Sequence, residues 1–210
     1  MIPPYPVYLF DVDGTLLDSA ADICGAVKEV LAQSDADGIP ESFLRRYIGR
    51  HMYDLFQDVM PGVSQPRMEE MLQSYRTLYH AREHRGTRVY MGVRETLARL
   101  GGRKSTATTK GTPTTRQVLE KFGLLEFFHH VQGTDGFPSK PAPDVVLKSL
   151  EALGARPEEC LLVGDSAPDM EAGRRAGVKV CAVRYGYGDP DELARWSPDY
   201  WISDLRELAN

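Results

Sequence analysis

Val7-Tyr8-Leu9-Phe10 runs directly into Asp11-Val12-Asp13-Gly14-Thr15, so an apolar segment is followed at once by two acids, a glycine and a hydroxyl. Four consecutive apolar residues without polar alternation are typical of a strand buried on both faces, as in a parallel sheet. Ligands bind at the carboxyl ends of such strands. The stretch therefore predicts a binding site directly after Phe10, and an ordinary acidic turn after a strand is the alternative.

The residue types after this strand indicate which ligand would bind there. Asp11 and Asp13 are separated by one residue, so both carboxylates can face the same side. Two neighbouring carboxylates repel each other unless a hard cation such as Mg²⁺ lies between them and a phosphate. Gly14 permits close approach of the backbone, and Thr15 adds a hydroxyl to the N–H groups of the turn. Residues 11–15 therefore predict a magnesium and phosphate site.

The composition excludes several classes of protein. The chain has 210 residues and a formal net charge of -5 at pH 7, which gives no support for a nucleic-acid partner. No apolar run approaches the ~20 residues that span a bilayer, and residues 1–6 lack the features of a signal peptide. We therefore expect a cytoplasmic protein, monomer or homodimer, that binds neither nucleic acid nor membrane.

The three cysteines are too widely spaced to indicate a disulfide framework or a zinc site. Cys160 and Cys181 fall in strand-like runs. We expect both to be small buried residues.

The chain divides by its periodicity into a helical section and an alternating section. Apolar residues recur at three-to-four spacing after Thr15, and from Glu41 to about Arg85 no strand is evident. A helical block of this length directly after a first strand is typical of an insertion that packs as its own small bundle. We expect this insertion over residues 17–87.

Elsewhere strands alternate with helices, which predicts an α/β fold with a Rossmann-like parallel sheet covered by helices on both faces. Strands are expected at 7–10, 104–108, 127–132, 160–163, 178–183 and 200–202, with strand-like residues at 90–93. Helices are expected at 112–122, 143–153, 170–176 and 204–208.

Further polar residues stand at strand ends or helix starts. Threonine hydroxyls at 106–109 can hold phosphate oxygens, although threonine also suits an ordinary strand end. Lys140 lies in a proline-rich turn, where a solvated surface lysine is the alternative. Asp165 and Asp169 follow a buried strand, and they either complete a metal site with Asp11 or cap the next helix.

In chain order these segments give Asp-x-Asp-Gly-Thr, a threonine, a lysine and Gly-Asp-x-x-x-Asp, which resembles the haloacid dehalogenase (HAD) superfamily over essentially the whole chain. The sequence is most similar to the phosphoglycolate phosphatase group, through Asp-Gly-Thr-Leu-Leu-Asp-Ser-Ala-Ala-Asp-Ile at 13–23, Lys-Pro-Ala-Pro-Asp at 140–144 and Gly-Asp-Ser at 164–166. The resemblance implies an HAD-like core domain, 1–16 and 88–210, and an α-helical cap domain, 17–87.

The resemblance also implies roles for individual residues. Asp11 would be the nucleophile that forms an aspartyl phosphate, and Asp13 the general acid and then base. Mg²⁺ would be held by Asp11, the main-chain carbonyl of Asp13 and Asp165, with Asp169 either reaching it through water or orienting Lys140. The expected catalytic residues are Asp11, Asp13, Thr108 and Lys140, and the expected phosphate-binding residues are Gly14, Thr15 and Thr109.

Two features depart from the pattern of the group. Thr109 stands where asparagine is frequent, and residues 104–107 are more polar than the usual second strand. The alignment of Thr108 therefore leaves Thr106 and Thr109 as alternatives.

In this group a glycine-containing stretch between cap helices faces the active site, and Arg45-Arg46-Tyr47-Ile48-Gly49-Arg50-His51 is the matching stretch here. Arg46, Arg50 or His51 would meet a substrate carboxylate or second phosphate. A solvated basic helix face is the alternative.

The resulting prediction is a Mg²⁺-dependent phosphatase that hydrolyses small phosphorylated metabolites through an aspartyl phosphate, with 2-phosphoglycolate as the leading candidate. The carboxylate of Asp13 favours phosphate esters, because relatives that act on carbon halides or phosphonates are expected to lack it. One alternative is a phosphomutase like β-phosphoglucomutase, which shares all four motifs. The other is a catalytically silent binding protein that keeps the fold.

Overall fold

A computed structural model describes residues 2–34 and 36–209. Met1 and Asn210, which end the predicted core domain, and Asp35 lie outside the described residues. Five parallel strands form the main sheet in the order β4-β1-β5-β6-β7. The strands are β1 Val7–Phe10, β4 Arg103–Thr106, β5 Cys160–Gly164, β6 Lys179–Val183 and β7 Tyr200–Ile202. This sheet confirms the predicted α/β fold.

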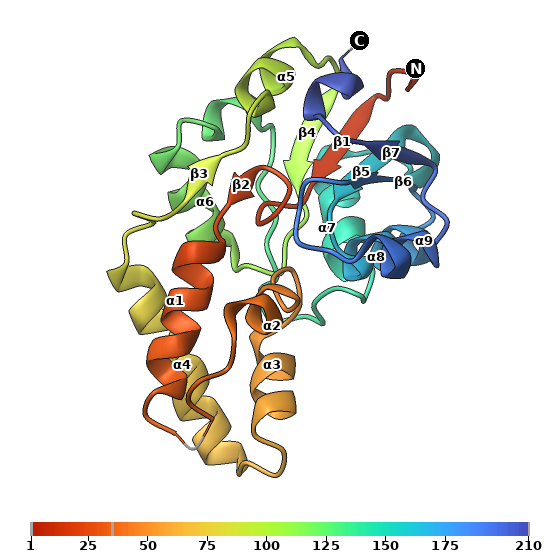
Figure 1. The fold of residues 1–210 in the computed structure, drawn as a ribbon. Helices are drawn as coiled ribbons and strands as arrows, with labels where there is room; N and C mark the ends of the chain where they lie inside the picture. The colour runs from red at the N-terminus through yellow and green to blue at the C-terminus, as the bar shows by residue number, and fades with distance from the viewer. Residues whose placement is uncertain (1, 35, 210) are drawn as a thin grey trace.

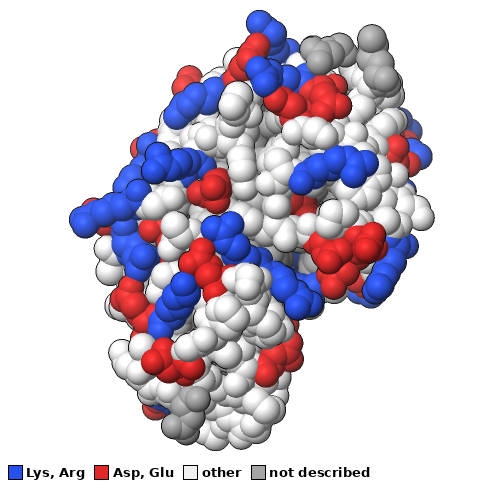
Figure 2. All heavy atoms as spheres, viewed as in Figure 1, with Lys and Arg blue, Asp and Glu red and all other residues white. Residues whose placement is uncertain are grey.

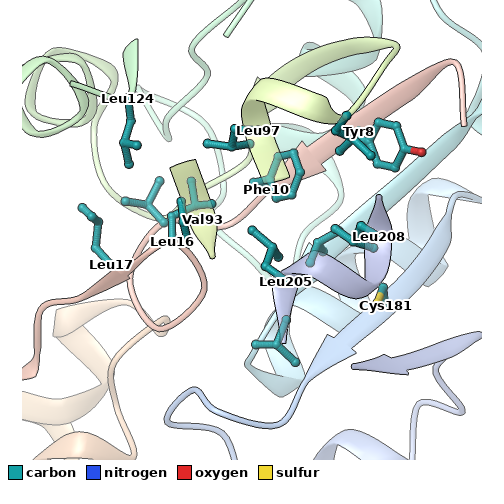
Figure 3. Close-up of a cluster of buried hydrophobic side chains, with 14 of the residues drawn as sticks. Tyr8, Phe10, Leu16, Leu17, Val93, Leu97, Leu124, Cys181, Leu205 and Leu208 are labelled. Atoms are coloured by element: carbon teal, nitrogen blue, oxygen red, sulfur yellow. The ribbon is translucent and has the colours of Figure 1, made fainter. Parts of the chain in front are cut away.

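Alternate residues of β1 point to opposite faces of the sheet, as the pleat requires. Tyr8 and Phe10 belong to one buried cluster, whereas Val7 and Leu9 belong to another. Figure 3 shows the first cluster, in which Tyr8 and Phe10 lie between Leu97 and the C-terminal turn of the chain. Burial on both faces explains why β1 reads as an uninterrupted apolar run.

Helices cover each face of the sheet. On the face of Tyr8 lie α5 Val93–Arg99, α6 Thr112–Lys121 and the 3₁₀ turn η3 Leu205–Leu208. On the face of Val7 lie α7 Asp144–Leu153, α8 Ala167–Ala176 and α9 Pro190–Ala194. A further 3₁₀ turn, η2 Pro157–Glu159, leads into β5.

The helices of the predicted insertion pack around a hydrophobic cluster of their own, which includes Leu31, Phe56 and Met71. Figure 1 shows them as a group beyond the end of the sheet to which β1 and β4 point. Their bounds are α1 Ala20–Leu31, α2 Glu41–Arg45, α3 Met52–Val59 and α4 Gln65–Ala81.

A short antiparallel pair, which the sequence did not reveal, joins the chain segments that enter and leave this helical group. In it β2 Leu17–Asp18 pairs with β3 Arg88–Val89. The buried carboxylate of Asp22 accepts hydrogen bonds from the Gly86 N–H at 3.0 Å and the Thr87 hydroxyl at 2.6 Å. The two connecting segments are therefore held side by side.

The predicted strand at 127–132 was wrong. Residues 125–127 form the 3₁₀ turn η1 Leu125–Phe127, and only an isolated bridge links Ser105 with His130. The N–H groups of His129 and His130 both donate to the carbonyl of Lys104, so no regular ladder continues from them. Phe127 and Phe128 are apolar because they pack against the first cluster, not because they lie in a strand.

Other expectations were partly met. The strand-like residues 90–93 form a turn and the start of α5, and strand pairing precedes them at β3. Cys160 and Cys181 are buried and free, as predicted.

No helix in the described part of the chain combines the length and the apolar character needed to cross a membrane. On the face in Figure 2, Lys and Arg side chains are interspersed with Asp and Glu.

Candidate active site

Three carboxylates meet at the carboxyl edge of the sheet, and we call them the carboxylate cluster: Asp11, Asp165 and Asp169. Asp11 follows β1, Asp165 follows β5, and Asp169 lies in the first turn of α8. Each has a carboxylate oxygen within 4.8 Å of the other two, and all three residues are buried. Neighbouring parallel strands end at the same edge, so residues far apart in the sequence converge there.

Lys140 is the cation of this cluster. Its Nζ lies 2.9 Å from Asp11 Oδ1, contacts Asp169 Oδ1 and donates to the Ala107 carbonyl at 2.9 Å. Its side chain is fully buried, so the alternative of a solvated surface lysine is excluded. Burial by itself lowers the pKa of Lys140, but Asp11 and Asp169 outweigh it and hold that pKa above its ordinary value. Lys140 is therefore charged.

Three ionised carboxylates in this cluster would carry more negative charge than Lys140 neutralises. Burial raises the pKa of Asp11 to about 7 although Lys140 opposes the shift, and burial together with Asp169 and Asp11 raises that of Asp165 well above its ordinary value. Neither oxygen of Asp11 accepts a well-aligned hydrogen bond from any described residue, despite the nearby Lys140. Converging carboxylates with unsatisfied buried oxygens are the donor set of a hard divalent cation, so the residues fit Mg²⁺.

Asp165 is positioned by both flanking loops. The Thr15 hydroxyl donates to Asp165 Oδ1 at 3.1 Å, and the Tyr187 N–H donates to Oδ2 at 2.8 Å. A Cβ on Gly14, whose φ is +92°, would stand 2.2 Å from Asp165 Oδ2. The Gly14 N–H donates to the Leu17 carbonyl at 2.8 Å, so in this structure the glycine supplies space for Asp165 rather than a free amide.

Asp169 caps the next helix, which is one of the roles that the sequence left open, and it also contacts Lys140. Its Oδ2 accepts hydrogen bonds from the N–H and hydroxyl of Ser166, which completes a capping box at the start of α8. Its Oδ1 contacts Lys140. The helix cap therefore fixes a carboxylate that in turn holds the lysine.

Asp13 stands apart from the carboxylate cluster and has its own partners. The Ser19 hydroxyl donates to Asp13 Oδ1 at 2.7 Å, and Lys110 Nζ lies 3.1 Å from Oδ2. Lys110 Nζ also donates to the Tyr79 hydroxyl on α4 at 2.9 Å. Sequence reasoning assigned no role to Ser19 or Lys110, although Ser19 lies within the motif at 13–23 and Lys110 directly follows the threonines at 106–109. A lysine directly after the threonines at the end of the second strand was the available signal.

A cavity of about 300 Å³ opens beside Asp13, between the edge of the sheet and the helices α3 and α4. Thr109, Lys110 and Gly111 line it from the sheet side. The helical group contributes mainly the turn before α3 and one face of α4: Tyr47, Ile48, Gly49, Arg50, His51, Met52, Leu72, Tyr75, Arg76, Tyr79 and His80.

The three expected residues of the helical insertion are not equivalent. Arg50 and His51 line the cavity, whereas Arg46 is exposed and does not. The turn after α2 presents the residues from Tyr47 onwards to the cavity and leaves Arg46 outside it. Arg50 also forms an ion pair with Glu192 at 2.9 Å, and His51 caps α3 by accepting from the Tyr53 N–H at 3.2 Å.

The threonines divide in a similar way. Thr108 is buried just after β4, close to the Ala107 carbonyl that Lys140 contacts, and its carbonyl accepts a hydrogen bond from the Thr134 hydroxyl. Thr109 lines the cavity. Thr106 is committed elsewhere, because its hydroxyl donates to the Gln132 carbonyl. Of the three alternatives at the end of the second predicted strand, Thr108 and Thr109 therefore remain available to the site.

Comparison with protein families places this geometry in a known group. The family model described as haloacid dehalogenase-like hydrolase matches residues 8–183. The chain belongs to this family. This assignment confirms the resemblance derived from the motifs. The matched residues include the helical group and the strands β1, β4, β5 and β6 of the sheet, and β7 lies beyond them.

Similar proteins of this haloacid dehalogenase-like family include phosphatases. A phosphoglycolate phosphatase of Aquifex aeolicus (strain VF5) is 33% identical over 97% of this chain and 94% of its own length. The pyrophosphatase PpaX of Halalkalibacterium halodurans is 32% identical over 96% and 94%. The crystal structure of a predicted phosphatase from Clostridium acetobutylicum superposes with a TM-score of 0.90 at 28% identity, covering 99% of this chain and 97% of that one.

Proposed function

We propose that the protein is a Mg²⁺-dependent phosphatase that hydrolyses small anionic phosphate monoesters through an aspartyl phosphate on Asp11. The observation that carries this proposal is the burial of Asp11 with Asp165, Asp169 and Lys140 at the edge of the sheet. Asp13, two residues after Asp11, lines the cavity beside them. Such a set provides a nucleophile, a cation site and an acid in one place.

Asp11 is the group available to attack phosphorus, because its oxygens are free of well-aligned hydrogen bonds from the described residues. The Oδ–P bond forms as the bond to the leaving oxygen breaks, and water later cleaves the aspartyl phosphate. Asp13 donates a proton to the leaving oxygen and then accepts one from the attacking water. Ser19 and Lys110 hold the Asp13 carboxylate toward the cavity for both steps.

Asp11, the main-chain carbonyl of Asp13 and Asp165 would hold Mg²⁺, and Asp169 holds Lys140 in place. When bound, the cation neutralises carboxylates and phosphate oxygens that otherwise repel each other. Lys140 stabilises the charge on the phosphoryl oxygens, and Thr108 orients them. The Thr15 hydroxyl, predicted to bind phosphate, instead donates to Asp165 and orients that carboxylate.

We further propose that residues 17–87 act as a cap domain over a core domain formed by 1–16 and 88–210. The separate hydrophobic cluster of α1–α4 supports this division. Arg50 and His51 on the cap side of the cavity would then meet the leaving group, together with Thr109 and Lys110 from the core side. A cytoplasmic location and a monomeric or homodimeric state stay predictions.

Phosphate release from a panel of esters tests the function. The panel contains 2-phosphoglycolate, pyrophosphate, hexose phosphates and phenyl phosphate, each with Mg²⁺ or EDTA. We expect turnover that EDTA and Asp11→Asn each abolish, and 2-phosphoglycolate is the first compound to test because similar proteins carry that name. Isomerised hexose phosphate without phosphate release would indicate a mutase, and a folded protein that turns over nothing would contradict the proposal.

A further inference from the structure

The cavity beside Asp13 has an uneven charge. Asp13 is the single acid among its described lining residues, whereas five lining side chains are basic or imidazole: Arg50, His51, Arg76, His80 and Lys110. A concave surface with this imbalance attracts an anion. Asp13 is the proposed proton donor to the leaving oxygen, so the leaving group of a bound phosphate monoester would extend into this cavity. An anion bound by the basic side chains would therefore be a second charged group on that leaving group.

Most of these side chains already have partners. Lys110 is paired with Asp13, Arg50 with Glu192, and His51 caps α3. Arg76 and His80 differ, because neither side chain forms a hydrogen bond or an ion pair with any residue in the described ranges 2–34 and 36–209. They are four positions apart on α4, so they lie on one face of the helix. Both line the cavity, which leaves them as its uncommitted anion-binding pair.

The rest of the wall is apolar and aromatic. Tyr75 and Tyr79 are stacked with ring centroids 5.9 Å apart, and Ile48 and Leu72 line the same cavity. At about 300 Å³ the cavity reaches the lower end of pockets that hold drug-sized ligands, far more than a two-carbon acid occupies. Glycolate would therefore leave much of this surface unfilled.

We propose that Arg76 and His80 form a second anion-binding position in this enzyme, which selects phosphate monoesters whose leaving group has an apolar or aromatic body ending in a carboxylate or second phosphate. This inference rests on the proposed phosphatase function and deepens it. The aromatic wall holds the body of the leaving group, and the guanidinium of Arg76 binds the distal anion with the geometric specificity of its planar fork.

Two aryl phosphates that differ only in a distal anion test the proposal: phenyl phosphate and 4-carboxyphenyl phosphate. We expect wild-type kcat/KM to be about tenfold higher for the carboxylated ester. Arg76→Gln should reduce this ratio to about one, mainly through KM of the carboxylated ester. Arg67→Gln is the matched control, because Arg67 is on the same helix, pairs with Glu70 at the surface and does not line the cavity.

A binding measurement separates failure of this inference from failure of the phosphatase proposal. Calorimetric titration of both esters into Asp11→Asn, with and without Arg76→Gln, reports the preference without turnover. A preference lost with Arg76 supports the second anion position even if no ester is hydrolysed. A ratio near one in the wild type, or a ratio that Arg76→Gln leaves unchanged in both assays, overturns it. Turnover of both esters at equal rates would then leave the phosphatase function standing alone.

Discussion

The carboxylate cluster and the cavity wall lie on either side of Asp13, and they are built in different ways. The cluster consists of fully buried side chains at strand ends, and each has at least one fixed partner there or in a flanking loop. The cavity wall combines buried side chains such as Ile48 and Tyr79 with exposed ones on α4 such as Arg76 and His80, whose side chains have no polar partner among the described residues. Rigid, buried groups suit chemistry common to many substrates, whereas an adaptable wall suits the choice of one substrate.

Lys140→Met should have the largest effect. Removing the one buried cation from beside Asp11 and Asp169 leaves their charge uncompensated, so we expect the free energy of unfolding to fall by about 3–5 kcal/mol. Turnover should fall about 10²–10³-fold because a charge on the phosphoryl group is lost. Urea unfolding and phosphate release measure the two effects.

Lys104→Met is the matched control for that change. Lys104 is also buried, but no described carboxylate pairs with it, and burial lowers its pKa. Its replacement should leave stability within about 1 kcal/mol. An equal loss of unfolding free energy in the two variants would show that pairing with Asp11 and Asp169 does not set the cost of removing Lys140.

Gly14→Ala should weaken cation binding about 10–100-fold, because the added Cβ would displace Asp165 from the cluster. Gly38→Ala is a control with nearly the same backbone, at φ +86°, and nothing within 4 Å of its Cβ. Each variant should lose about 1–2 kcal/mol of stability through left-handed strain. Isothermal titration with Mg²⁺ then separates them, and similar affinities in both variants would contradict the role of Gly14.

The carboxylate cluster should also bind Mg²⁺ in a pH-dependent way. Without a cation, burial raises the pKa of Asp11 to about 7 and that of Asp165 well above normal, so these groups hold protons that Mg²⁺ must displace. Apparent affinity should therefore rise by up to about tenfold as the pH increases through the pKa of Asp11, and displacement of a proton from Asp165 should steepen the dependence. Titrations in buffers of different ionisation enthalpy count the released protons, and an affinity independent of pH would refute this expectation.

On the cavity side, Arg50→Ala should produce the smallest of these changes. Its ion pair with Glu192 is more than one-third exposed on both sides, and it shares the cavity with other basic groups. We expect KM for anionic esters to rise about two- to threefold, with stability nearly unchanged. Arg46→Ala should change neither quantity, since Arg46 lies outside the cavity. A larger effect from Arg46 than from Arg50 would show that the cavity is not the route of the leaving group.

Asp11 and Asp165 were predictable because each directly follows an uninterrupted apolar strand, and strand ends of one parallel sheet meet at one edge. The predicted strand at 127–132 failed because its aromatic residues mimic a buried strand while they pack as a loop. Lys110 and Ser19 escaped notice because their significance depends on Asp13, which only the folded chain brings to them.

The sequence by itself therefore indicated the five strands of the sheet, the helical character of the segment after the first strand and the carboxylates Asp11, Asp165 and Asp169, since local periodicity and short-range motifs encode them. The tertiary structure alone decided which side chains of the helical group line the cavity. Arg46, Arg50 and Arg76 are equally basic in the sequence, and only the packing of α2, α3 and α4 leaves the first outside the cavity and places the other two on its wall. Helix orientation depends on contacts between distant residues, which periodicity does not specify.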